Sequence, residues 1–232
     1  MGYKILSKTK LSDDLYELKI SAPNVTKRGQ AGQFIILRVE EKGERVPLTI
    51  ADLDRENGIL TIVFMGVGFT TKKLAQLNEG DEILDLVGPL GVATEIKNYG
   101  TVVLLAGGYG AAPCYLISKA LKEAGNKVYM IMGARKADLI FWQDKMKAAS
   151  TELFITTDDG SLGRKGFVTE VLKELMQKEK IDMVMAVGPM PMMKAVAELT
   201  RSDKIKTICS LNPIMVDGTG MCGACRVSVG GQ

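Results

Sequence analysis

The feature that most constrains the fold is a change of sequence rhythm near residue 98. Before that point, short apolar and β-branched runs alternate with glycine and proline, which is the spacing of strands and tight turns. The one strong helix signal in this half is at Thr70–Leu77. We therefore predict a small antiparallel β-barrel, with strands at Leu15–Ile20, Gln33–Val39, Leu48–Ala51, Ile59–Phe64 and Glu82–Val87.

From Thr101 onward, apolar runs alternate with amphipathic helical stretches, which is typical of βαβ units on a parallel sheet. Pro113 suits the first turn of the first helix, and Gly125 suits its end. We expect five parallel strands, at 101–108, 127–134, 152–157, 182–188 and 205–210. The expected helices cover 113–125, 138–148, 167–177 and 191–199.

The chain is therefore predicted to have an α+β fold of two domains. An antiparallel β-barrel at 1–97 precedes an α/β parallel-sheet domain at 98–211, and a short loop segment follows at 212–232. The polar stretch 95–100, which ends in glycine, is the expected linker. A length of 232 residues suits two modest domains.

The sequence has no histidine, which excludes the usual general base, the Ser-His-Asp and Cys-His arrangements and the commonest metal ligand. Catalysis must rest on a cofactor or on other groups. A net charge of +3 does not indicate nucleic acid or an anionic membrane, and the apolar runs are about half a bilayer span. Four cysteines are too few for a secreted disulfide framework, so we expect a cytoplasmic protein. From the charge and the short apolar runs we expect no membrane or nucleic-acid partner.

A glycine-rich turn, GGYGAAP at 107–113, lies between a predicted strand and a predicted helix. Such a turn lets backbone N–H groups approach a pyrophosphate, although an ordinary tight turn also fits its G-x-G-x-x-P spacing. The motif GPMPMM at 188–193 ends another strand at the same carboxyl edge, where ligands bind in open α/β sheets. The candidate nucleotide-binding residues are Gly108, Gly110, Pro113, Gly188, Pro189 and Met190.

Two aspartates, Asp158 and Asp159, follow the third strand predicted for the second half. A carboxylate there would accept a hydrogen bond from a ribose 2′-hydroxyl and repel a 2′-phosphate, which favours NAD(H) over NADP(H). A polar Asp-Gly turn is the alternative. Arg164 and Lys165 follow closely and could instead bind a phosphate, so the choice of nucleotide stays open.

The segment DGTGMCGACRVSV at 217–229 carries the most specific spacing in the chain. Asp217, Cys222 and Cys225 stand at D-x4-C-x2-C, which is the plant-type [2Fe–2S] spacing with aspartate in the first place. Small residues between them would let the backbone wrap a cluster. Half a zinc site and a CxxC redox pair are the alternatives.

A plant-type cluster takes a fourth ligand, and we expect it beyond Gln232. The sequence RVSVGGQ is typical of a strand that enters a Gly-Gly turn, and its returning strand is missing. Cys114 and Cys209 are on or beside core elements, where cysteine is usually a small buried apolar residue.

Two motifs of the first half suggest a flavin. VPLTIAD at 46–52 could press backbone amides against an isoalloxazine edge, with the Thr49 hydroxyl near N5. GVGFTTKKL at 66–74 places Thr70 and Thr71 at a helix N-terminus, where a flavin pyrophosphate could bind. An ordinary strand start and an ordinary N-cap are the alternatives.

Over essentially its whole length, the chain resembles the ferredoxin–NADP reductase superfamily. It is similar to the electron transfer subunits of dihydroorotate dehydrogenase. It is more similar to the small (alpha) subunits of NADH-dependent reduced ferredoxin:NADP oxidoreductase, also called sulfide dehydrogenase subunits, because these have aspartate in the first ligand position. The motifs are RVPLTIAD, GPLG, GGYGAAP, TTDDGSLGRKGF, GPMPMMKAV and LNPIMVDGTGMCGACRV.

This resemblance implies an FAD-binding barrel, an NAD(P)-binding domain and a [2Fe–2S] segment ligated by Asp217, Cys222 and Cys225. The arginine of the family's flavin motif falls on Val46, which leaves the role of the neighbouring Arg45 open. The residues that the resemblance assigns to FAD are Pro47, Leu48, Thr49, Val63, Phe64, Met65, Gly68, Thr70 and Thr71.

The resemblance also implies a function. The chain would be an electron transfer flavoprotein subunit that passes electrons between NAD(P)H, FAD and a [2Fe–2S] cluster, to or from a larger flavin and iron–sulfur subunit. Ferredoxin is a candidate further partner, and no side chain is assigned as a catalytic acid or base. The alternatives are an electron transfer subunit of dihydroorotate dehydrogenase and a non-catalytic NAD(H)-binding redox sensor.

Overall fold

The computed structural model describes residues 2–231 and divides into two compact units. One unit takes Tyr16–Thr94, the N-terminal residues up to Thr9 and the residues from Leu211 onward. The other takes Lys10–Leu15 and Glu95–Ser210. Antiparallel sheets form the first unit and a parallel sheet with helices forms the second, so the predicted α+β two-domain fold is confirmed.

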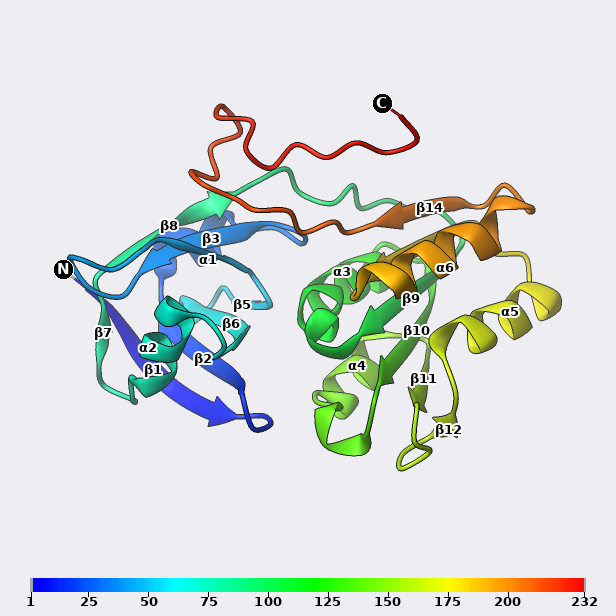
Figure 1. The fold of residues 1–232 in the computed structure, drawn as a ribbon, viewed down its shortest axis with the longest axis horizontal. Coiled ribbons are helices and arrows are strands. Elements are labelled where there is room, and N and C mark those ends of the chain that lie inside the picture. Colours follow the sequence, from blue (N-terminus) through cyan, green and yellow to red (C-terminus); the bar gives the residue numbers. More distant parts are fainter. Residues whose placement is uncertain (1, 232) are drawn as a thin grey trace. The chain divides into compact units, whose positions relative to one another are not determined.

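The first unit contains two antiparallel sheets (Figure 1). A five-stranded sheet has the order β5-β6-β2-β1-β7, and a three-stranded sheet has the order β4-β3-β8. Ile5, Leu18, Ile35 and Ile62 are fully buried in its core. Its elements are β1 Tyr3–Lys10, β2 Leu15–Ser21, α1 Pro23–Arg28, β3 Phe34–Arg38, β4 Val46–Thr49, β5 Asp52–Asp54, β6 Ile59–Met65, α2 Phe69–Gln76, β7 Glu82–Ile83 and β8 Asp85–Leu90.

The prediction for this unit was wrong at four points. β1, α1 and β5 were not expected from the sequence, and the strand expected at Glu82–Val87 is two strands. The break falls at Leu84, where the chain leaves one sheet for the other: β7 pairs with β1, and β8 pairs with β3. The nearly continuous extended segment 82–90 therefore supplies one strand to each of the two sheets.

The second unit is one parallel sheet of order β12-β11-β10-β9-β13-β14, flanked by the helices α3 to α6 (Figure 1). Its central strands are apolar throughout because helices cover them, and Val102–Leu105 are fully buried. Its elements are β9 Thr101–Gly107, α3 Ala111–Glu123, β10 Lys127–Ala134, α4 Gln143–Ala149, β11 Glu152–Thr157, β12 Arg164–Lys165, α5 Val168–Lys178, β13 Met183–Val187, α6 Met190–Arg201 and β14 Lys206–Cys209, with short 3-10 turns η1 Gly108–Gly110 and η2 Ala137–Leu139.

Five of these parallel strands were predicted, and the two-residue β12 is a sixth. The helix expected at 138–148 is shorter, because η2 and a left-handed Trp142 with a φ of 58° precede α4. The strand expected near Val227 does not form, since within residues 2–231 no neighbouring strand pairs with that segment. In this same range, no helix combines the length and apolarity needed to cross a membrane.

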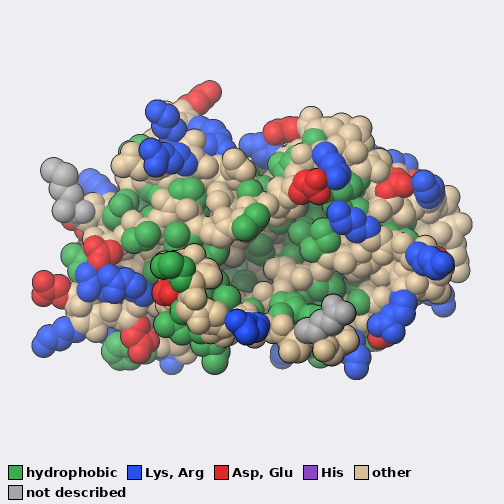
Figure 2. Space-filling view, turned by 90° about the horizontal axis from the view of Figure 1, so that it is seen from above, with side chains coloured by type: hydrophobic (Ala, Val, Ile, Leu, Met, Phe, Trp, Pro, Cys, Tyr) green, Lys and Arg blue, Asp and Glu red, His purple; other side chains and the backbone are tan. Residues whose placement is uncertain are grey.

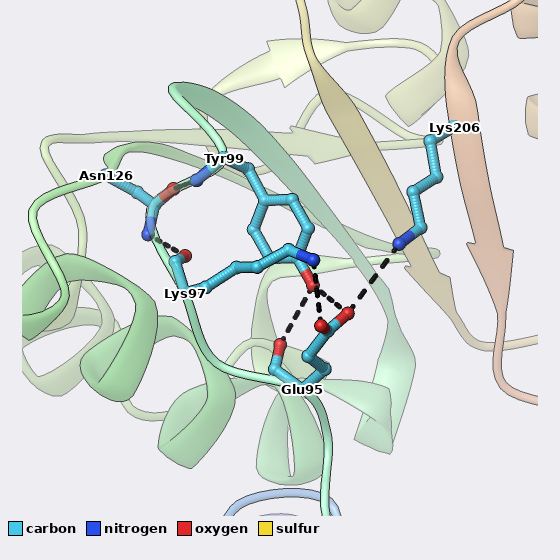
Figure 3. A network of polar contacts seen from close by, with 5 residues as sticks. All are labelled: Glu95, Lys97, Tyr99, Asn126 and Lys206. Carbon is cyan, nitrogen blue, oxygen red and sulfur yellow. Dashed lines mark hydrogen bonds and ion pairs between the residues drawn. The ribbon is translucent and has the colours of Figure 1, made fainter.

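The start of the second unit is held by the side chain of Asn126, which is 5% exposed. Its amide donates hydrogen bonds to the carbonyls of Lys97 at 2.9 Å and Leu121 at 2.7 Å. Its oxygen accepts from the N–H groups of Tyr99 at 2.6 Å and Gly100 at 3.2 Å. One buried side chain thus fixes the last residues before β9 (Figure 3).

Glu95 gathers a second set of contacts in the same segment (Figure 3). Its carboxylate accepts from Lys97 Nζ at 2.8 Å and from the Tyr99 hydroxyl at 2.9 Å, and Lys206 Nζ lies 4.0 Å away. The Lys97 hydrogen bond is the main cause that lowers the pKa of Glu95 below its usual value. Since these groups are solvent-exposed, the buried Asn126 is expected to matter more for stability.

Asn126→Ala is expected to lower the free energy of unfolding by about 3 kcal/mol, because it leaves several buried backbone groups unpaired. Asn98→Ala is the matched control, since Asn98 is exposed and is expected to change stability by no more than about 1 kcal/mol. Chemical denaturation of both variants measures the difference. Equal losses would contradict the role given to Asn126.

Candidate functional site

The ends of β9 and β13 approach each other closely at glycines predicted to bind nucleotide. These strands are parallel neighbours in the sheet. A Cβ added at Gly110 would lie 2.4 Å from the Val187 carbonyl oxygen, and one at Gly188 would lie 2.9 Å from the Cα of Gly107. Gly110 and Gly188 therefore permit a backbone contact that a larger residue would block.

Gly108 differs from these two glycines. Its φ is +57°, and a Cβ added there would have no atom within 4 Å. Ala111 follows as the first residue of α3, and the N-cap Gly110 has no side chain to cover the helix start. The turn thus has free space beside Gly108, and the first N–H groups of a helix lack partners within the helix, which fits an anionic ligand.

The remaining candidates lie around the same edge. Pro113 is half-buried in the first turn of α3, where its missing N–H costs no helical hydrogen bond. Pro189 and Met190 are exposed at the start of α6, and Met190 is 60% exposed. The structure therefore brings all six predicted nucleotide-binding residues to the carboxyl edge of the parallel sheet.

The two aspartates after β11 have different surroundings. Asp159 Oδ1 accepts hydrogen bonds from the Ser161 N–H at 2.9 Å and the Ser161 hydroxyl at 2.6 Å, and these lower the pKa of the Asp159 carboxyl. Asp158 is exposed, and its carboxylate makes no hydrogen bond or ion pair with residues 2–231. Arg164, the rival phosphate ligand, is paired with Glu170 and Glu174.

In the first unit, three of the residues assigned to FAD lie in an edge strand. Pro47, Leu48 and Thr49 are half-buried in β4, which is antiparallel to β3 and pairs Thr49 with Phe34. β4 also lies beside β6, so the two predicted flavin segments are neighbours. All of these flavin-assigned residues belong to the first unit.

The end of β6 offers one side chain to a ligand. Val63 and Phe64 are 6% and 1% exposed, and the Phe64 ring stacks on Tyr16 with 5.8 Å between centroids. Met65 is 39% exposed. Any FAD contact from Val63 or Phe64 would therefore come from the backbone.

The start of α2 contains an unpaired buried hydroxyl. Gly68 is the N-cap, and its N–H donates to Thr71 Oγ1 at 2.9 Å. Thr70 is 7% exposed, and among residues 2–231 its Oγ1 is the one buried side-chain oxygen or nitrogen without a hydrogen-bond partner. A buried hydroxyl without a partner is unfavourable, so this helix start fits a ligand that supplies an acceptor.

The C-terminal segment packs against the three-stranded sheet of the first unit. A Cβ at Gly218 would lie 2.5 Å from Ile36 Cδ1 and 3.2 Å from the Phe34 ring, and both residues are in β3. Figure 1 shows this segment lying over the three-stranded sheet. The predicted cluster loop therefore begins on the strand that pairs with β4.

The three predicted iron ligands are exposed. The Thr219 N–H donates to Asp217 at 2.9 Å and is the main cause of a lowered Asp217 pKa, to which the Cys222 thiol also contributes. Within residues 2–231, no group of three His, Cys, Asp or Glu side chains is arranged to hold a metal ion, so the three predicted ligands are not assembled into such a group. Their chemistry fits an iron–sulfur donor set.

The surroundings of these ligands are apolar and glycine-rich. Gly218, Gly220 and Gly223 have positive φ, which gives the loop the tight turns that wrapping a cluster needs. Ile214 and Met221 are 81% and 85% exposed. Figure 2 shows apolar side chains exposed among charges of both signs on the face seen there.

The other two cysteines are less exposed than Cys222 and Cys225: Cys114 is buried and Cys209 is half-buried. Burial raises the pKa of the Cys114 thiol to about 12, and burial also raises the pKa of Cys209. Both lie in core elements, α3 and β14, as predicted. Arg45, whose role the sequence left open, has its guanidinium 3.9 Å from the Asp85 carboxylate.

Residues 104–198 match the family of oxidoreductase NAD-binding domains. A Thermotoga maritima protein named as a homologue of the electron transfer subunit of dihydroorotate dehydrogenase B (NAD+) is 48% identical, over 99% of this chain and 81% of that protein. The electron transfer subunit itself from Fusobacterium nucleatum is 34% identical, over 93% of this chain and 84% of that protein. The chain belongs to the ferredoxin–NADP reductase-like family of electron transfer subunits.

A solved structure extends this assignment. A chain of the NADH-dependent reduced ferredoxin–NADP oxidoreductase, a structure described for flavin-based electron bifurcation, superposes with a TM-score of 0.94. The two chains are 47% identical, and the match covers 100% of this chain and 84% of that one. The chain is thus an NAD-binding oxidoreductase subunit of a flavoprotein family.

Ser161 is the residue at this site that the sequence analysis missed. Its hydroxyl accepts from the Ala137 N–H at 2.8 Å while it donates to Asp159. The pattern Asp-Gly-Ser, with a serine two residues after an aspartate, is typical of such side-chain turns and could have identified it. The family's NAD-binding match includes this loop.

Proposed function

We propose that the chain passes electrons from NAD(H) through FAD to a [2Fe–2S] cluster and on to a larger subunit that carries a second flavin and further iron–sulfur clusters. The carrying observation is the contact of Gly218 with β3, because β3 pairs with the β4 strand proposed to hold the flavin. Exposed ligands on an apolar segment support a partner surface there. Free cysteines at 222 and 225 suit a reducing cytoplasm.

The roles of the residues follow from their surroundings. Pro47, Leu48, Thr49 and Met65 would line the flavin, and Gly68, Thr70 and Thr71 would bind its pyrophosphate at the start of α2. Gly108, Gly110, Gly188, Pro189 and Met190 would hold the nicotinamide nucleotide at the edge of the parallel sheet. When bound, these cofactors supply hydride and single-electron transfer, so the chain itself needs to bind, orient and exclude water.

The cluster would be held by Asp217, Cys222 and Cys225. Carboxylate in place of one thiolate gives a mixed donor set, which changes the electronic environment of the iron. NAD(H) is preferred over NADP(H) because the exposed Asp158 carboxylate would repel a 2′-phosphate. Ferredoxin is proposed as a further partner of the assembled complex.

An anaerobic titration of the FAD-loaded protein with NADH tests this proposal. Bleaching of the flavin absorbance, followed by an electron paramagnetic resonance signal from reduced iron, is the expected sequence. A protein that takes up no FAD, or a flavin that NADH does not reduce, would overturn it. NADPH in place of NADH tests the nucleotide preference.

A second candidate is an electron transfer subunit of a dihydroorotate dehydrogenase, which the names of the Thermotoga and Fusobacterium relatives favour. The aspartate in the first ligand position favours the bifurcating type instead. The subunit that co-purifies with the chain distinguishes the two, because a dihydroorotate-oxidising partner would support the second. Family membership favours either of these over a non-catalytic redox sensor.

Thr70→Val is expected to act in opposite directions on the two forms of the protein. Without FAD, removal of an unpaired buried hydroxyl should raise the free energy of unfolding by about 1 kcal/mol. With FAD, loss of the hydroxyl donor should weaken cofactor binding by about tenfold.

Thermal unfolding of both forms and fluorescence titration with FAD measure these effects. Thr71→Val is the comparison for stability: the Thr71 hydroxyl already bonds to Gly68, so its loss should destabilise the FAD-free form, which Thr70→Val should stabilise. Unchanged FAD affinity in Thr70→Val would remove this residue from the binding site.

A further inference from the structure

We propose that Asp159 is a positioning residue of the NAD(H) site, which acts through Ser161 on the neighbouring loop at Ala137 and does not contact the nucleotide. This inference rests on the proposed function of the parallel-sheet edge. It assigns different roles to two adjacent aspartates that the sequence leaves equivalent.

The hydrogen bonds form a continuous chain between two loops. Asp159 Oδ1 accepts from both the N–H and the hydroxyl of Ser161, at 2.9 and 2.6 Å. The Ser161 hydroxyl in turn accepts from the Ala137 N–H at 2.8 Å. Because a hydroxyl has one proton, donation to Asp159 leaves the Ser161 oxygen oriented to accept from Ala137.

The two linked loops follow adjacent parallel strands. β10 ends at Ala134 and β11 ends at Thr157, and these two residues pair in register. The Asp158 N–H donates to the Ala134 carbonyl at 3.1 Å, so the loops begin in contact and the Ser161 bridge keeps them together several residues further on. Nucleotides bind along this carboxyl edge in open α/β sheets.

The bridge also satisfies a group that has no local partner. Ala137 is the first residue of η2, and the N–H groups at the start of a helical turn lack partners within that turn. The preceding residue makes no side-chain cap. Ser161 takes the place of that cap from the other loop, because its hydroxyl accepts from the first N–H of η2.

The surroundings separate Asp159 from Asp158. Both are exposed, but the Asp159 oxygen used here is committed to Ser161, whereas the Asp158 carboxylate has no partner within residues 2–231. A carboxylate already bonded to its own loop has less capacity to accept from a ribose hydroxyl. Asp158 is the group left available for that contact.

A double-mutant cycle tests the inference on the full chain, with NADH as the probe. Asp159→Ala and Ser161→Ala should each weaken NADH binding by about fivefold in calorimetric titration, and the double variant should be no weaker than either alone. In the FAD-loaded protein, KM for NADH should rise while kcat stays unchanged. Asp159→Asn keeps an acceptor oxygen and should recover much of the affinity.

Asp158→Asn is the matched comparison, because it makes the same chemical change one residue away. It should reduce the preference for NADH over NADPH, which the Asp159 and Ser161 variants should leave unchanged. Hydrogen exchange at the Ala137 amide should quicken in Asp159→Ala and Ser161→Ala and stay as in the wild type in Asp158→Asn. This measurement shows whether loss of the Ser161 bridge exposes the Ala137 amide to solvent more often.

Two results would overturn the inference alone: wild-type NADH affinity in Ser161→Ala, or losses that add in the double variant. Either would mean that Ser161 does not transmit an effect of Asp159 to the NADH site. If the wild-type protein bound no NADH, the proposed function of this edge would fail, and the inference would fail with it. The wild-type titration therefore distinguishes the two failures.

Discussion

Cys222→Ala and Cys225→Ala are each expected to remove the iron–sulfur cluster while FAD stays bound. Thiolates are the principal ligands of such clusters, and loss of one from a site with a mixed donor set leaves the iron without sufficient coordination. Both cysteines are exposed and outside every helix and strand, so stability should change by no more than about 0.5 kcal/mol. Iron and acid-labile sulfide per flavin, after anaerobic purification, measure the loss.

Cys209→Ala is the control for this experiment. Burial raises the pKa of the Cys209 thiol, so this residue is a poor source of thiolate and its variant should keep a full complement of iron. Asp217→Cys extends the test to the third ligand: the reduction potential and the electron paramagnetic resonance spectrum should change. Full iron content in both Cys222→Ala and Cys225→Ala would contradict ligation by this segment.

Periodicity predicts the second unit well because its central strands are continuous apolar runs separated by amphipathic helices. The strand that it misses is the two-residue β12, which is charged and exposed. The first unit is harder. In β1, YKILSKTK, only Ile5 is fully buried, so the strand shows no alternation strong enough to identify it. The six-residue α1 is too short for a helical repeat to be visible.

The site shows a similar division. Motif spacing predicts which glycines and aspartates bind the nucleotide, but it does not distinguish their roles. Gly108 and Gly110 are alike in sequence, and only the fold brings the Val187 carbonyl against Gly110 and leaves Gly108 open. Asp158 and Asp159 are separated in the same way, by a bond to Ser161 that depends on the turn.

The orphaned Thr70 hydroxyl is a further example. A threonine near a helix start normally indicates an N-cap, and the sequence offers no reason to expect an unpaired one. The structure uses Gly68 as the cap and Thr71 as its partner, which leaves Thr70 buried and unsatisfied. Motif spacing cannot predict that Thr70 is buried, and it is this burial that makes its unpaired hydroxyl indicate a ligand.

Gly110→Ala is expected to lower the free energy of unfolding by about 3 kcal/mol and to weaken NADH binding severely. The backbone of Gly110, with φ −58° and ψ −11°, would accept alanine, so conformational strain is not the reason. The added methyl would lie 2.4 Å from the Val187 carbonyl oxygen and 3.0 Å from its carbon. Those atoms end a central strand, and they cannot move away without displacing β13 from β9.

Gly108→Ala is the matched comparison, and it should lower NADH affinity with only a small loss of stability. Its methyl would meet no atom within 4 Å, so the stability loss should be limited to about 1 kcal/mol from the positive φ. The same methyl would project into the open turn proposed for the pyrophosphate, so NADH affinity should still fall. Thermal unfolding and calorimetric titration of both variants separate packing from binding. If Gly110→Ala unfolded at the wild-type temperature, the close contact between β9 and β13 would be wrong, and Gly110 would be a ligand-facing glycine like Gly108.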